Sequence, residues 1–278
     1  MGTITGRDKE ITKGRIDRIE SLYVLPLLLI VMLLAIYMIA PAFYLEHVLQ
    51  ELKREQQVVE IITFLCGLVG SLLILSSAAR LLMRSPKWLA LRGPAGAAAI
   101  MGVIGLAGLF FAGEEISWGQ SYFGWETPEE YLEVSIETNL HNRKDIPISV
   151  QGLGSFFLIC MFMILPLVWH MERKARDRDP HSRPLLPRAW APAIAEGPVV
   201  FTFVVAFVWK ECKNIYLAVV DVGDRPDPRF YWDFLEQVNE HKEMLVAVGL
   251  LMYGLYRIRA TRTTRSIETS QAQAESDD

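Results

Sequence analysis

The sequence holds few of the residues on which common soluble chemistries depend. Its 278 residues include three cysteines and five histidines. Cys66, Cys160 and Cys212 stand far apart, with no C-x-x-C spacing, which argues against a zinc knuckle or a disulfide framework. The chain also has no phosphate-binding glycine loop, no G-x-S-x-G elbow and no H-E-x-x-H helix. It has no basic stripe with interleaved aromatic residues, so nucleic acid is not expected as a partner.

What the sequence does have is a series of long apolar blocks with the charges between them. Hydrophobic residues make up 51% of the chain and charged residues 22%. Each block is close to the roughly 20 residues that a helix needs to cross a bilayer, and the backbone of a lipid-embedded segment must satisfy its own hydrogen bonds. We therefore predict an all-α polytopic membrane helix bundle of about six transmembrane helices. The expected spans are residues 21–45, 58–83, 94–113, 150–169, 197–220 and 237–256.

Polar segments flank this expected membrane domain of residues 21–259. Residues 1–20 are predicted to be a cytoplasmic N-terminal segment, and residues 260–278 a disordered cytoplasmic tail. The block that begins at residue 21 follows basic residues, as a signal peptide does. Its apolar core is longer than the 7–15 residues of a signal peptide, so we expect a true span.

Lysine and arginine are distributed unequally between the two sides of the predicted bundle. The side with both termini holds 18 of them and the opposite side holds 7. The positive-inside rule then places both termini in the cytoplasm. The loops Glu46–Gln57, Glu114–Ser149 and Asp221–Glu243 are expected to face outward. In the second loop, Thr127 and Pro128 form a good helix start and predict a short interfacial helix between spans three and four.

Polar residues from four separate elements are predicted to reach one depth, the outer leaflet. Two adjacent carboxylates at the end of the third span are costly there unless they are paired, protonated or bound to a cation. The candidate metal ligands are Glu114, Glu115, Glu137, His141, Glu211, Glu240 and His241, with Lys210, Asn214 and Trp118 beside them. Glu115, His141 and His241 are the candidate catalytic groups.

Spacing along the helices supports these candidates. Glu137 and His141 lie one turn apart if their segment is helical, a spacing that suits a chelated metal or an acid–base pair. Glu236, Glu240 and Glu243 share one helix face. Carboxylates and histidines are the ligands of di-iron and di-manganese bundles, although the usual Glu-x-x-His pairs are missing. Zinc, iron or manganese are therefore the expected metals, and carboxylates paired with the two lysines, without a metal, are the alternative.

Three sequence strings carry a resemblance. They are GEEISWGQ at 113–120, GWETP at 124–128 and ETNLHN at 137–142. Together they resemble a family of uncharacterised bacterial multi-spanning inner-membrane proteins. The resemblance implies the bacterial inner membrane as the location and directs attention to the same residues, but it implies no activity.

Three functions remain open on these grounds. The first is an integral membrane enzyme whose site at the outer leaflet acts on a lipid or another apolar substrate. The second is an accessory or scaffold subunit with a structural ion-pair cluster. The third is a cation or proton transporter, with Lys210 and Glu211 as an intramembrane relay.

Overall fold

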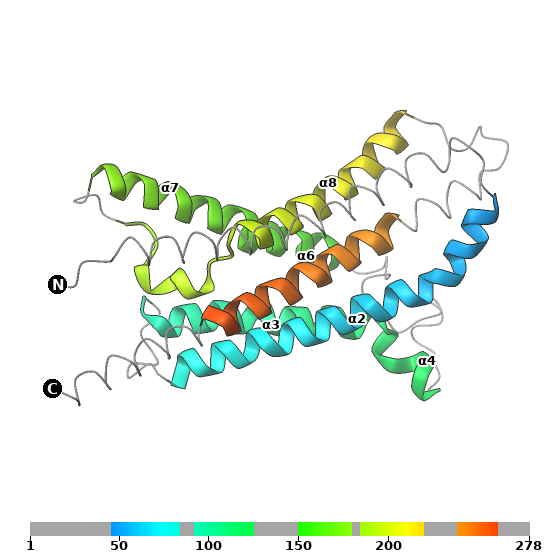
Figure 1. Cartoon of the computed structure of the whole chain (residues 1–278), viewed down its shortest axis with the longest axis horizontal. Coiled ribbons are helices and arrows are strands. Elements are labelled where there is room, and N and C mark those ends of the chain that lie inside the picture. The colour runs from blue at the N-terminus through cyan, green and yellow to red at the C-terminus, as the bar shows by residue number, and fades with distance from the viewer. Residues whose placement is uncertain (1–45, 84–91, 125–149, 180–183, 220–237, 261–278) are drawn as a thin grey trace, which may run out of the picture. The chain divides into compact units, whose positions relative to one another are not determined.

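The structure is a computed structural model that describes residues 46–83, 92–124, 150–179, 184–219 and 238–260. These residues contain helices and no strand (Figure 1), which confirms the all-helical class. The helices are α2 Glu46–Met83, α3 Pro94–Glu115, η2 Ser117–Gly119, α4 Gln120–Phe123, α6 Val150–Ile159, the π-helical turn η3 Cys160–Ile164, α7 Leu165–Arg178, η4 Arg188–Ala193 and α8 Gly197–Val219. Residues 238–260 form the last helix.

The chain divides into two compact units, Met1–Arg54 and Glu55–Asp278. In the first unit the structure describes residues 46–54, which are helical and belong to α2. Everything discussed below lies in the second unit. The expected N-terminal segment, the expected span 21–45, the interfacial helix after Thr127 and the C-terminal tail beyond residue 260 lie outside the described residues.

Among the residues that the structure describes, three helices are long and apolar enough to cross a membrane. They are Val59–Met83, Pro94–Glu115 and Gly152–Arg178. They overlap the expected spans 58–83, 94–113 and 150–169 and support an integral membrane protein. The expected spans at 197–220 and 237–256 fall on α8 and the last helix, which do not belong to these three. The count of six spans therefore stays a prediction.

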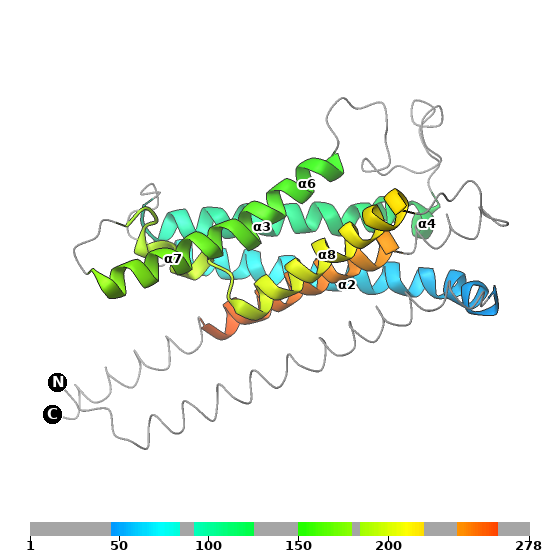
Figure 2. The ribbon, with the colours of Figure 1, turned by 90° about the horizontal axis from the view of Figure 1, so that it is seen from above.

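Glycines allow α2, α3 and the last helix to pack with their backbones close together. A Cβ atom at Gly70 of α2 would lie 2.6 Å from the backbone nitrogen of Leu251, and one at Gly254 would lie 2.7 Å from the carbonyl oxygen of Gly70. On α3, a Cβ at Gly105 would lie 2.6 Å from the side chain of Leu75. Small residues permit such close approach between membrane helices, and the three helices lie side by side in both ribbon views (Figure 1 and Figure 2).

A buried aromatic cluster connects η3, α8 and the last helix. Phe162 stacks on Phe203 with ring centroids 3.9 Å apart and meets Tyr253 edge-on at 5.4 Å. The Tyr253 hydroxyl donates a hydrogen bond to the carbonyl oxygen of Ala193 at 2.7 Å. The last helix is thus fixed both to α8 and to the short helix η4 that precedes α8.

The glycine contacts predict unequal effects of two alanine substitutions. Gly70→Ala forces a methyl group against the backbone of the last helix, so we expect the free energy of unfolding to fall by about 1–3 kcal/mol. Gly102→Ala is the matched control, because a Cβ there meets nothing within 4 Å; alanine should leave stability unchanged or raise it by up to about 1 kcal/mol. Thermal unfolding in detergent measures both variants. Equal melting temperatures for the two would contradict the close packing.

Candidate functional site

At its end, α3 turns sharply and folds Trp118 back over the helix. Ser117, Trp118 and Gly119 have φ values of 45°, 56° and 85°, all in the left-handed region that only glycine adopts without strain. The indole ring covers Gly113, where a Cβ would lie 2.8 Å from the ring. The ring also meets Phe110 edge-on at a centroid distance of 5.5 Å. Gly113 and Gly119 therefore serve this turn, one by leaving room and one by its backbone freedom.

Glu114 is the hydrogen-bonding partner of the turn. Its side chain is buried, with the residue 3% exposed, and Glu114 Oε1 accepts a hydrogen bond from Trp118 Nε1 at 2.5 Å. A non-glycine residue in a left-handed conformation costs about 1–3 kcal/mol, and a hydrogen bond to a charged acceptor offsets part of this cost. Glu114 thus has a structural partner within its own segment.

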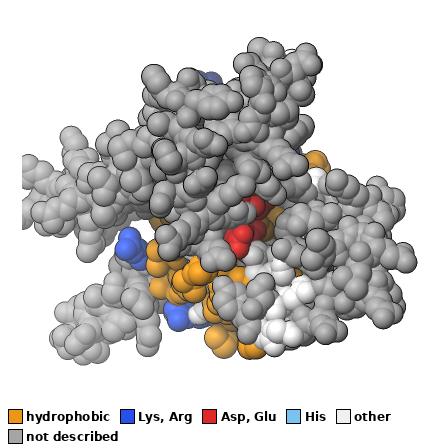
Figure 3. All heavy atoms as spheres, turned by 90° about the vertical axis from the view of Figure 1, so that its right-hand side faces the viewer, with side chains coloured by type: hydrophobic (Ala, Val, Ile, Leu, Met, Phe, Trp, Pro, Cys, Tyr) orange, Lys and Arg blue, Asp and Glu red, His pale blue; other side chains and the backbone are white. Residues whose placement is uncertain are grey.

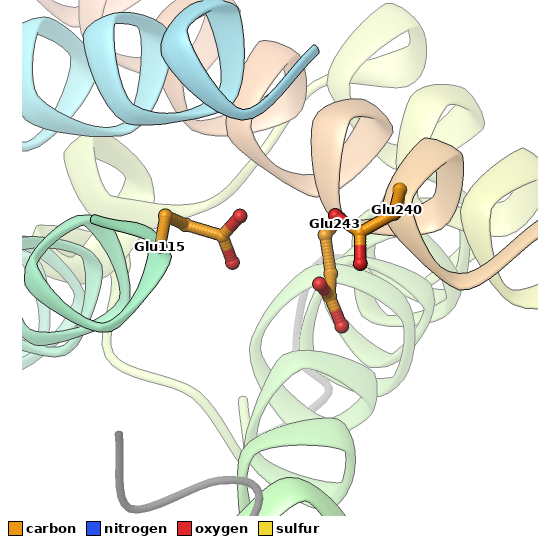
Figure 4. A group of neighbouring side chains, drawn as sticks. All are labelled: Glu115, Glu240 and Glu243. Atoms are coloured by element: carbon orange, nitrogen blue, oxygen red, sulfur yellow. The ribbon is translucent and has the colours of Figure 1, made fainter. Parts of the chain in front are cut away.

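Glu115 points instead toward the last helix. Carboxylate oxygens of Glu115, Glu240 and Glu243 all lie within 4.8 Å of one another. Figure 4 shows the three side chains directed toward a common space, Glu115 from α3 and the other two from the last helix. All three residues are half-buried. We call them the carboxylate cluster, and the end of the bundle where they lie the carboxylate end.

Charges of both signs act on this cluster. Lys242 Nζ lies 3.0 Å from Glu243 Oε1, with side chains only 11% and 13% exposed. Glu60 and Lys242 also lie within electrostatic range of Glu115. One lysine balances one carboxylate, so the others repel unless protons or a cation lie among them. Seen from the carboxylate end, acidic side chains gather in one place beside apolar ones (Figure 3).

The carboxylate cluster can hold a metal ion. It offers oxygen ligands only, and oxygen ligands suit hard cations such as Mg²⁺, Ca²⁺ and Mn²⁺. The same carboxylates can accept or release protons if no metal is bound. The carboxylate cluster is therefore a candidate site for a cation or a proton, with ligands from two helices.

Other expected site residues on the last helix and on α8 lie apart from the carboxylate cluster. The ring of His241 lies 6.5 Å from that of Trp209, whose Nε1 donates a hydrogen bond to the carbonyl oxygen of Val238 at 2.8 Å. His241 is thus directed to α8. Glu211 is exposed and accepts a hydrogen bond from Asn214 at 3.1 Å. Lys210 is half-buried on the same helix.

Two expected ligands, Glu137 and His141, lie outside the described residues. The structure adds Glu243 to the candidate ligands and Glu60 to the neighbouring charges. The three-residue spacing from Glu240 to Glu243 was the available signal for Glu243, since it places both on one face of a helix. Glu60 gives no such signal, because only the packing of α2 brings it near.

Comparison of the chain with protein-family models, with curated proteins and with solved structures finds no match.

The turn after α3 predicts a coupling between Trp118 and Glu114. Trp118→Phe keeps a ring over Gly113 and removes the indole donor, while Glu114→Leu removes the acceptor. We expect the two changes to be non-additive by about 1–3 kcal/mol in the free energy of unfolding, because each breaks the same hydrogen bond. Unfolding curves of both single variants and the double variant measure this coupling. Strict additivity would show that the bond contributes nothing.

Proposed function

We propose that this integral membrane protein holds a divalent cation in the carboxylate cluster and uses it in an enzyme reaction at the outer leaflet. The observation that carries the proposal is the convergence of Glu115, Glu240 and Glu243, from two helices, within 4.8 Å. Ionisable groups at the end of a membrane span cost free energy, and for that reason they favour a functional site. The outward orientation follows from the lysine and arginine distribution in the sequence.

The ligand chemistry favours manganese among the three metals expected from the sequence. Zinc and iron prefer sites that include histidine or cysteine, whereas carboxylate oxygens suit manganese, magnesium and calcium. The His241 ring is directed to Trp209 and gives no support for a histidine ligand from the last helix.

A bound cation would polarise a carbonyl or phosphoryl oxygen, or activate a water molecule. A carboxylate that is not used as a ligand would then act as the general base. The site lies at the end of apolar helices, and Trp118 exposes 43% of its surface there, at the level where aromatic rings meet lipid headgroups. A lipid or another apolar molecule is therefore the substrate class we propose.

A structural role as an accessory or scaffold subunit is the second candidate, and the Lys242–Glu243 ion pair favours it. Lys242 and Glu243 are neighbours on the last helix, so the pair can neutralise both charges there without any ligand, as a structural cluster requires. The third candidate, a cation or proton transporter with Lys210 and Glu211 as its relay, has less support. The Glu211 carboxylate is exposed and accepts a hydrogen bond from Asn214.

Metal affinity tests the proposal. We expect the detergent-purified protein to bind Mn²⁺ with a simple saturable isotherm, and Glu115→Gln or Glu243→Gln to weaken that affinity at least about tenfold. Glu211→Gln is the matched control, because it makes the same chemical change on an exposed helix surface and should leave affinity unchanged. Absence of saturable Mn²⁺, Mg²⁺ and Ca²⁺ binding by the wild-type protein would overturn the metal site.

Stability in the presence of a chelator separates the two candidates. If the cluster is a cation site, Glu115→Gln relieves repulsion among carboxylates, so the metal-free variant should melt above the metal-free wild type, and Mn²⁺ should raise only the wild-type melting temperature. If the cluster is a structural ion-pair network, Glu243→Gln should cost about 3 kcal/mol with or without metal, because Lys242 loses its partner. Thermal unfolding of both variants, with and without Mn²⁺, distinguishes these outcomes.

A further inference from the structure

A second candidate site is a cavity of about 1160 Å³ lined by α7, η4 and the first turns of α8. It lies at the part of the bundle where α7 ends and α8 begins, and it shares no residue with the carboxylate cluster. Arg173, Arg176 and Arg188 line it, so we call it the arginine cavity. Asp177 and Glu196 line it as well. The lining therefore holds three arginines and two acidic residues.

Arg176 carries a buried hydrogen-bond donor that needs an acceptor. Its guanidinium lies 5.3 Å over the ring of Trp169, which orients the group by a cation–π contact. Its NH1 atom is buried and has no hydrogen-bond partner among the described residues. A buried donor without an acceptor is costly, and an oxygen of a bound anion would satisfy it.

Glu172, one turn before Arg176 on α7, is one competing acceptor, besides Asp177 and Glu196 in the cavity lining. Its Oε1 accepts hydrogen bonds from the backbone N–H groups of Leu185 and Leu186, and its Oε2 is buried without a partner in the described part of the chain. Glu172 therefore holds the segment before η4 in place. If the Glu172 side chain moved so that its Oε2 paired with Arg176, the arginine would have a structural role. The experiment below distinguishes that case.

Apolar side chains form the other wall of the arginine cavity. Met163, Leu167, Phe201 and Val204 line it, and Leu167 and Phe201 expose 58% and 45% of their surface. A free phosphate ion needs no such wall, whereas an acyl chain does. Basic pockets between transmembrane helices that combine arginine with an apolar wall suit lipid headgroups.

We propose that the arginine cavity binds an anionic phospholipid, with the phosphate at Arg173, Arg176 and Arg188 and an acyl chain along the apolar wall. The sequence places the segment from Arg173 to Arg188 on the cytoplasmic side, so the ligand would come from the cytoplasmic leaflet. Trp169 suits the headgroup level of that leaflet.

The test uses the full-length protein in nanodiscs or detergent, with phosphatidylglycerol and phosphatidylcholine as probes. Arg173→Gln combined with Arg176→Gln should weaken the apparent affinity for phosphatidylglycerol at least roughly thirtyfold, since each change removes a charge-assisted hydrogen bond to the lipid phosphate. Lys174→Gln combined with Arg178→Gln is the matched control, because it removes two positive charges from the same helix at residues outside the lining. Native mass spectrometry of retained lipid measures both. Equal losses in the two double variants would overturn the site in favour of general surface charge.

A second measurement needs no variant. Phosphatidylglycerol should raise the melting temperature of the wild-type protein by several degrees more than phosphatidylcholine does, and millimolar inorganic phosphate should not reproduce the effect. Equal stabilisation by both lipids would overturn the proposal. Stabilisation by inorganic phosphate alone would also overturn it and identify a small-anion site. If the Arg173/Arg176 double variant loses stability without lipid and phosphatidylglycerol gives the wild type no added stability, the arginines are structural and the proposal fails.

Discussion

Close packing between glycine-bearing helices is the constraint on which the candidate site depends. A Cβ at Gly108 of α3 would lie 3.2 Å from the side chain of Leu250 on the last helix, so this pair marks one layer of the bundle. Glu115 follows Gly108 by seven residues, and Glu243 precedes Leu250 by seven. Because a helix rises 1.5 Å per residue, both carboxylates lie about 10 Å from the same layer. Their convergence is therefore a consequence of helix register, and a shift of one turn in that register would separate them.

Neighbouring residues in the sequence take different roles because each step along a helix turns the side chain by about 100°. Glu114 and Glu115 are adjacent, yet the first bonds to Trp118 within its own segment and the second meets the last helix. Glu240 and His241 divide in the same way, one toward α3 and the other toward Trp209 of α8. One residue of each adjacent pair thus serves local structure, while the other enters the carboxylate cluster.

This division of roles between adjacent residues explains which site residues could be predicted from the sequence and which could not. Hydropathy predicted the apolar spans 58–83 and 94–113 because length and composition are enough for that purpose. The ends of the predicted spans also give the depth of a residue in the membrane. For this reason Glu115 and Glu240 were expected at the same depth. The direction of a side chain around its helix depends on packing with other helices, so the sequence could place Glu240 and Glu243 on one helix face but could not show that this face meets Glu115. The left-handed turn at Ser117 was equally hidden, since serine and tryptophan do not favour that conformation.

The two candidate sites also give the described bundle an electrical polarity. Glu115, Glu240 and Glu243 concentrate negative charge where α3 ends, whereas the cavity where α8 begins is lined by three arginines together with Asp177 and Glu196. An anionic lipid is attracted to arginine and repelled by a carboxylate cluster, and a divalent cation has the opposite preference. The carboxylate cluster therefore disfavours the anionic lipid proposed for the arginine cavity.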